Sequence, residues 1–302
     1  MMGFHHTAVD NASSTCNKTG SRMVVISSEI MVVVIIAIIL MIYHLLSRGL
    51  VSHWLLIIPI VGFGLSLLDS SIGMGYGTIG SPLLIVLGFS SRLVVPSILV
   101  SQLVSAVIAS TFHQKQGNVN YFDLGRNDAG IVSRLVVFGL IGTVVGAILA
   151  IQLSKIYLNT YIGLLVIAMG SILLLKPKLT FSWFKVNLIS LISGFNKAMS
   201  GGGYGPVATT GLVVTGNPLK NSVGATLFSV IFINITSFVI YLLTKSITSL
   251  QLPIFLTIGV LIGSQVGPRI TGRIGVSNVA KVAFACISIA MGALIIFLTF
   301  VG

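Results

Sequence analysis

The sequence predicts an all-α integral membrane protein built from inverted repeats, with seven full spans and two broken, re-entrant helical hairpins that carry glycine-rich motifs. Three observations lead to this fold class. The 302 residues are 55% hydrophobic and only 7% charged, with a mean hydropathy of +1.08, whereas soluble domains carry about 25% charged residues. Apolar runs of spanning length recur along the chain, and two similar glycine-rich motifs interrupt further apolar segments.

Seven apolar runs approach or exceed the roughly 20 residues that a helix needs to cross the hydrocarbon core of a bilayer. They cover residues 24–46, 93–113, 131–152, 156–175, 221–244, 252–268 (somewhat short) and 277–300. The polar segment 1–22 precedes the first run, which has no small-residue cleavage site at its end. We therefore expect a tail before a span rather than a cleaved signal peptide.

The two remaining apolar segments, residues 54–89 and 186–216, are the ones that the glycine motifs interrupt. The first motif reads DSSIGMGYGT from Asp69 to Thr78, and the second reads KAMSGGGYGP from Lys197 to Pro206. They align without a gap at an offset of 128 residues. We interpret each segment as a hairpin that returns to the side from which it entered.

The odd number of full spans and the charge of the loops together place the N-terminus inside and the C-terminus outside. Twelve Lys and Arg residues then lie on the inner side and four on the outer side, which agrees with the positive-inside rule. The expected organisation is an N-terminal tail with an extra transmembrane helix (1–53), a first repeat (54–175) and a second, inverted repeat (176–302). Each repeat contains one hairpin and three helices, and we expect a multi-pass protein of the cytoplasmic membrane.

Composition and motifs exclude several function classes. The net charge of +12 comes from cations in short loops rather than from a clustered basic stripe with aromatic residues between the cations, so no nucleic-acid partner is expected. Two cysteines and five scattered histidines form no disulfide framework or metal motif, and no metal or cofactor is expected. No nucleophile–base motif is found, which argues against an enzyme.

The glycine breaks are the candidate binding site. Glycine permits backbone conformations closed to other residues and lets a ligand approach closely. A new helix begins after each break, near Thr78 and at Pro206, and the N–H groups of a helix N-terminus favour an anion. The alternative is that the glycines only allow close helix packing. The candidate substrate-binding residues are Gly75, Tyr76, Gly77, Thr78, Lys197, Ser200, Gly201, Gly202, Gly203, Tyr204 and Gly205.

Asp69 and Lys197 occupy equivalent positions in the two motifs and lie in apolar sequence. An ionised side chain near the middle of a bilayer costs at least about 2.5–3.5 kcal/mol on insertion scales, so each needs a partner or a shifted pKa. One interpretation is a structural ion pair across the symmetry axis. The functional hypothesis is that Lys197 attracts an anion while Asp69 accepts or releases a proton.

Hydroxyl groups near the breaks are weaker candidates, because Ser and Thr in membrane helices often bond to their own backbone. Beyond those already named, they are Ser81, Thr209 and Thr210. The equivalent tyrosines Tyr76 and Tyr204 fit either paired gates or packing.

The two motifs resemble those of the TauE/SafE (sulfite exporter) family of membrane permeases. The resemblance covers both repeats but not the span 24–46. It rests on Asp69 with Gly73 to Thr78, on Gly194, Lys197, Ala198 and Ser200 to Pro206, and on residues 96–102, 112–120 and 223–226. It implies a permease for sulfur-containing anions such as sulfite, sulfonates or thiosulfate. Gln102 is a second-rank site residue on this comparison. Similar sequences often carry Glu there, and the difference weakens the expectation of proton coupling.

The sequence favours a secondary anion transporter in the lipid bilayer that works by alternating access. That the anion partner is a small sulfur compound is what the family resemblance implies. An anion channel would use the same symmetry and would be distinguished by sustained current under voltage without coupling to protons. A non-transporting accessory subunit is the other alternative. The substrate, the direction of flux, proton coupling and the oligomeric state stay open at this stage.

Overall fold

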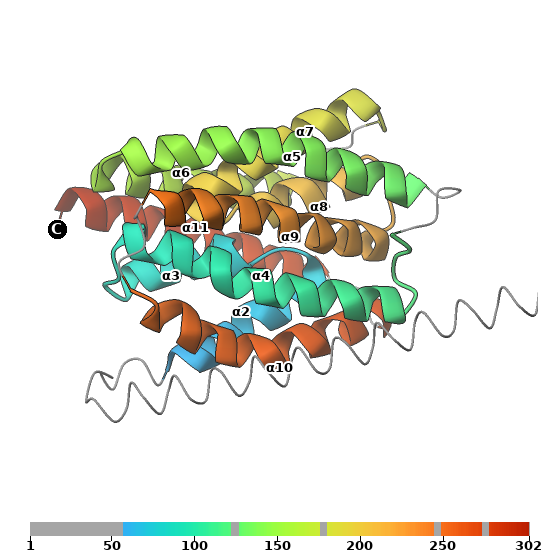
Figure 1. Cartoon of the computed structure of the whole chain (residues 1–302), viewed down its shortest axis with the longest axis horizontal. Coiled ribbons are helices and arrows are strands. Elements are labelled where there is room, and N and C mark those ends of the chain that lie inside the picture. The colour runs from blue at the N-terminus through green and yellow to red at the C-terminus, as the bar shows by residue number, and fades with distance from the viewer. Residues whose placement is uncertain (1–56, 122–126, 176–179, 245–248, 274–277, 302) are drawn as a thin grey trace, which may run out of the picture. The chain divides into compact units, whose positions relative to one another are not determined.

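The computed structural model describes residues 57–121, 127–175, 180–244, 249–273 and 278–301. Within these residues the chain forms ten helices and no strand (Figure 1). The helices are α2 Ile58–Ile72, α3 Tyr76–Val86, α4 Ser91–Lys115, α5 Asn127–Gln152, α6 Lys155–Leu175, α7 Trp183–Ser200, α8 Tyr204–Val214, α9 Leu219–Leu243, α10 Gln251–Arg273 and α11 Asn278–Val301. The predicted all-helical class is confirmed for this part of the chain.

Five of these helices are long and apolar enough to cross a membrane. They are α4, α5, α6, α9 and α10, and they coincide with the predicted spans at 93–113, 131–152, 156–175, 221–244 and 252–268. The predicted span 277–300 corresponds to α11, Asn278–Val301. The predicted span 24–46 lies outside the described residues. The chain is a multi-pass membrane protein.

The distribution of side chains fits a lipid environment. Large apolar side chains stand exposed along the outer faces of the helices, among them Val137, Ile141, Leu164 and Ile262, each more than half exposed. The interior holds many serines and threonines that are almost fully buried. An apolar exterior with small polar residues between the helices is typical of membrane bundles, because lipid supplies no hydrophobic drive to hide apolar groups.

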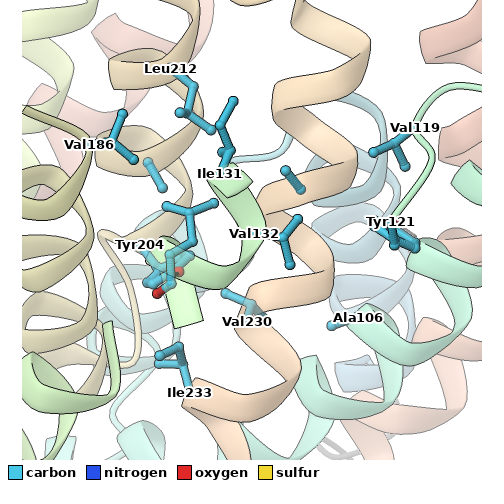
Figure 2. Packing of buried hydrophobic residues seen from close by; sticks show 13 residues of the cluster. Ala106, Val119, Tyr121, Ile131, Val132, Val186, Tyr204, Leu212, Val230 and Ile233 are labelled. Atoms are coloured by element: carbon cyan, nitrogen blue, oxygen red, sulfur yellow. Dashed lines mark hydrogen bonds between the residues drawn. The ribbon is translucent and has the colours of Figure 1, made fainter. Parts of the chain in front are cut away.

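A hydrophobic cluster joins helices of both halves of the chain. Figure 2 shows Ile131 and Val132 of α5 packed with Val230 and Ile233 of α9, with Ala106 of α4 nearby. The cluster also contains residues of α7 and α8. The core therefore depends on contacts between segments far apart in the sequence.

Two pairs of helices pack in parallel, each across the two halves. Helix α2 lies along α10, with Gly62 against Leu256 at one end and Ser70 against Gly267 at the other. Helix α7 lies along α5 in the same way, where the main chain of Leu191 and Phe195 touches the glycines of α5. At the offset of 128 residues, α2 corresponds to α7 and α10 to α5, so the two pairs are equivalent. Figure 1 shows them at the lower and upper edges of the bundle.

Two further pairs consist of equivalent helices that run antiparallel. In the α6–α11 pair, Gly163 packs against Gly292 whereas Gly170 packs against Ala285. In the α4–α9 pair, the Tyr121 hydroxyl bridges the carbonyl oxygens of Ser110 and Gly224, at 3.1 and 3.3 Å. At the other end of that pair, Val95 and Leu99 share a buried cluster with Tyr241. Equivalent helices thus meet in opposite directions.

Candidate functional site

The two glycine motifs form similar breaks, each of which ends one helix at a left-handed glycine. Helix α2 ends at Gly73, whose φ of 75° is left-handed and whose N–H bonds to the Asp69 carbonyl at 2.7 Å. Helix α7 ends in the same way at Gly201, with φ 72° and a 2.8 Å bond to the Lys197 carbonyl. The residues that precede α3 and α8, Gly75 and Gly203, also have positive φ. These positions favour glycine because a Cβ would be strained there.

The breaks touch each other through their main chains. A Cβ placed on Gly77 would overlap the carbonyl of Gly201, and a Cβ on Gly205 would overlap the carbonyl of Gly73. Gly202 lies in the same way against the main chain of Gly77. In this conformation the predicted site glycines therefore allow the two hairpins to pack closely against each other. Close packing was the alternative to ligand binding in the sequence analysis. Whether they also bind a ligand stays a prediction.

Hydroxyl groups bridge the two breaks. The Ser81 hydroxyl donates to the Ser200 carbonyl at 2.7 Å, and the Thr209 hydroxyl donates to the Gly73 carbonyl at 2.9 Å. Thr78 accepts a hydrogen bond from the N–H of Gly203 at 3.2 Å. These bonds satisfy backbone groups that the breaks expose, since a buried main-chain group without a partner is costly.

The other predicted polar residues have separate roles. Ser200 bonds back to the Asn196 carbonyl at 2.7 Å and accepts the N–H of Gly202 at 3.0 Å. The Tyr204 hydroxyl donates to the Leu135 carbonyl at 3.3 Å. Thr210 is partly exposed on α8 and lies apart from these bonds.

The two buried charges meet through Gln102. The amide nitrogen of Gln102 donates to Asp69 Oδ2 at 2.7 Å, and the ammonium group of Lys197 donates to Gln102 Oε1. Lys197 also donates to the carbonyl of Gly201. All three side chains are at most 5% exposed. The expectation that Asp69 and Lys197 face each other directly is thus modified, because within the described residues an amide from α4 joins them.

The hydrogen-bonded arrangement Asp69–Gln102–Lys197 gives each of the two charges a partner. A carboxylate only accepts and an ammonium only donates, so an amide with one end of each kind matches both. Breaking such a buried arrangement leaves an uncompensated charge, which is strongly destabilising. Sequence analysis named all three residues but placed Gln102 in the second rank, since spacing gave no indication that α4 would pass between the breaks.

A second polar cluster, which the sequence did not single out as a site, lies where α2, α4 and α10 meet. His113 Nε2 lies 2.8 Å from the Ser70 carbonyl, and His113 Nδ1 lies 3.1 Å from the Asn118 amide nitrogen. The same nitrogen donates to the Pro268 carbonyl at 3.1 Å. Because a carbonyl can only accept, the imidazole carries its hydrogen on Nε2. The cluster links the end of α2 to α4 and α10 at Ser70, the residue that directly follows Asp69.

A metal site finds no support in the described part of the chain. No group of three or more His, Cys, Asp or Glu side chains is placed there to hold an ion. The residues at the breaks offer hydroxyl, amide, ammonium and carboxylate groups instead, which suit hydrogen bonding to a small polar ligand.

Comparisons with known proteins give one family. The model of the sulfite exporter TauE/SafE family matches residues 58–295, which include both glycine breaks. A probable membrane transporter protein of Bacillus subtilis (strain 168), YtnM, is 30% identical over 166 residues. This match covers 51% of the present chain and 53% of the relative, so the alignment spans about half the length of each. No solved structure matches significantly.

Proposed function

Because the chain belongs to the TauE/SafE sulfite exporter family, a family of membrane transporters, we propose that it is a secondary transporter that moves small sulfur-containing anions across the cytoplasmic membrane. The observation that carries the proposal is the buried chain Asp69–Gln102–Lys197 at the junction of the two glycine breaks. Ionisable side chains inside membrane proteins are rare and mark substrate or ion pathways. Sulfite is the substrate that the family's description names, and thiosulfate and sulfonates are chemically related sulfur anions.

The helix directions support a fold with re-entrant hairpins. Consecutive full spans alternate in direction. If the chain reverses at each glycine break, the directions of all four helix pairs follow. These are the antiparallel pairs α4–α9 and α6–α11 and the parallel pairs α2–α10 and α5–α7. If both breaks were kinks in continuous spans, α4 and α9 would run parallel. With the predicted span 24–46, this arrangement has seven full spans and two hairpins.

The same directions support inverted repeats over 54–175 and 176–302. An axis in the membrane plane that relates the halves turns each helix upside down, so equivalent helices that meet on the axis are antiparallel. Helices α4 and α9 meet in this way at the breaks. The distribution of cations then favours an inner N-terminus and an outer C-terminus.

The mechanism that fits this arrangement is alternating access around the junction of the breaks. The ammonium group of Lys197 gives the junction its affinity for an anion, and Gln102 keeps the Asp69 carboxylate at a distance from that charge. Rocking of one repeat against the other would expose the junction to one side at a time. The bonds from Ser81 and Thr209 to the opposite hairpin are contacts that such a motion would stretch or re-form.

The test is anion flux into proteoliposomes that contain the purified protein. Sulfite, thiosulfate and a small sulfonate are compared, with and without an imposed pH gradient, for wild type, Lys197→Ala and the control Lys185→Ala. Lys185 lies on the same helix and bonds to Thr180, away from the break. We expect saturable wild-type flux that is lost only in Lys197→Ala. Absence of flux for all three anions contradicts the proposed substrate class, and sustained current without saturation would indicate a channel.

A further inference from the structure

Four buried polar side chains near the breaks have groups that no neighbour in the described residues satisfies. They are Asn234, with both its amide nitrogen and its amide oxygen, Ser237, Ser105 and Tyr76. Each of these side chains is completely inaccessible to solvent. A buried polar group without a partner is costly and needs an explanation, such as a bound molecule or a role in function.

Three of these residues lie on the α4–α9 seam. Ser105 belongs to the run Ile98, Gln102, Ser105 and Ala109 on α4, all buried and spaced by three or four residues. Asn234 and Ser237 belong to the run Leu227, Val230, Asn234, Ser237 and Tyr241 on α9, which is buried in the same way. Such spacing places each set on one face of its helix.

Contacts at both ends fix the register of this seam. At one end, Tyr121 ties Ser110 to Gly224, and Ala109 clusters with Leu227. At the other end, Val95 and Leu99 cluster with Tyr241. For antiparallel helices with these end points, the midpoint of the seam brings Gln102 of α4 opposite residues 232–234 of α9. Asn234 and Ser105 are therefore within about one helical turn of the residue that links Asp69 to Lys197.

The fourth residue, Tyr76, reaches the same place from the first break. It is the first residue of α3, and its side chain lies beside Ser101, the residue before Gln102. Residues of α3, α4 and α9 thus bring hydroxyl and amide groups close to Gln102, the residue whose side chain Lys197 contacts. Of the three N–H bonds of the Lys197 ammonium, two point to Gln102 and to Gly201, which leaves one for a ligand.

We propose that Asn234, with Ser105 and Ser237, forms the binding site for a small oxyanion at the α4–α9 crossing, next to Lys197. This inference rests on the proposed function and assigns its substrate site to side chains in the middle of two helices rather than to the glycine main chain. The two serine hydroxyls and the asparagine amide can donate to several oxygens at once, while the ammonium supplies the opposite charge. Groups that lack partners without the anion gain them when it binds.

The experiment compares Asn234→Leu with Asn159→Leu. Asn159 is a matched control because it is also a buried asparagine with an unsatisfied amide oxygen, but it lies on α6. For each protein, sulfite flux in proteoliposomes gives KM, and thermal unfolding in detergent gives Tm with and without sulfite. Losing one hydrogen bond to a charged ligand corresponds to a roughly tenfold to hundredfold rise in KM.

We expect Asn234→Leu to raise KM by that factor and to abolish the increase of Tm that sulfite causes in wild type. Its Tm without sulfite should be at least that of wild type, because leucine removes an unsatisfied amide. Asn159→Leu should keep both KM and the sulfite effect. An unchanged KM in Asn234→Leu overturns the inference, including the case in which Tm falls, which would indicate a structural role.

Two further variants test the inference in case Asn234→Leu does not fold. Asn234→Asp keeps the shape but repels an anion, and Ser105→Ala removes one donor; both should weaken sulfite binding in the Tm assay, and normal binding in both overturns the inference. Wild-type flux separates the two proposals. If wild type carries none of the anions, the proposed function fails, whereas wild-type flux that the Asn234 variants retain contradicts only the present inference.

Discussion

Ser81 and Thr209 are equivalent residues, 128 positions apart, and each donates a hydrogen bond to the main chain of the opposite glycine break. The acceptors are the carbonyls of Ser200 and Gly73, at 2.7 and 2.9 Å. A Cβ at Gly201 or Gly73 would meet these same hydroxyl oxygens. The two hairpins therefore bind each other reciprocally, and the repeat in the sequence is matched by a repeat in the hydrogen bonding.

Removing either hydroxyl should destabilise the hairpin junction. We expect Ser81→Ala and Thr209→Val each to lower the free energy of unfolding by about 1–3 kcal/mol, because a buried carbonyl loses its partner. Thermal or denaturant unfolding in detergent measures the change. Thr160→Val is the control, since the exposed Thr160 hydroxyl bonds only to its own helix and its loss should have little effect. Equal stability of all three variants would contradict the reciprocal arrangement.

A methyl group between the breaks should prevent their contact. We expect Gly205→Ala to reduce both monodisperse yield and flux sharply, because the added Cβ would overlap the Gly73 carbonyl, which belongs to the main chain and cannot turn away. Size-exclusion chromatography and flux in proteoliposomes measure these effects. Gly64→Ala is the matched control on α2, where a Cβ meets nothing within 4 Å; alanine there should stabilise the helix by about 0.5–1 kcal/mol. A well-folded, active Gly205→Ala protein would contradict the packing.

The helices and the breaks could be predicted from the sequence because they depend on local properties. Span length and hydropathy identified α4, α5, α6, α9 and α10, and glycine at equivalent positions marked the two breaks. The left-handed conformation of Gly73 and Gly201 follows from the same local chemistry. Such features need no knowledge of which segments meet.

The position of Gln102 and the hydrogen bonds that the hydroxyl groups make between the breaks could not be predicted, because they depend on how α4 and the two hairpins pack together. The sequence paired Asp69 with Lys197 by symmetry, but the equivalent of Gln102 at the same offset is Val230, so symmetry gave no indication of the bridge. His113 gave no signal either, since the group that its Nε2 contacts is the main-chain carbonyl of Ser70, and any residue supplies such a carbonyl.

Neutralising both charges should be less harmful to stability than neutralising one. We expect Lys197→Met to cost about 3–5 kcal/mol of unfolding free energy, because Asp69 then stays buried without its counter-charge. The double variant Asp69→Asn, Lys197→Met should recover most of this loss. Flux should be absent from both, since the anion has lost its attracting charge. Unfolding and flux are measured on the same preparations, and a double variant that transports anions would show that the charges serve structure alone.

Asp69 should be the group through which protons affect transport. Its carboxylate lies one amide away from Lys197, so binding of an anion at the ammonium changes the charge that Asp69 experiences and favours its protonation. We expect wild-type flux to respond to an imposed pH gradient and Asp69→Asn flux to be slower but independent of it. Asp128→Asn is the control: that carboxylate lies at the start of α5 and accepts from the Asn221 amide at 2.9 and 3.1 Å, outside the breaks, so its pH response should match wild type. Flux of a well-expressed Asp69→Asn protein that keeps the wild-type pH dependence would exclude Asp69 as the proton carrier, and the carboxylate would then act only to balance the charge of Lys197.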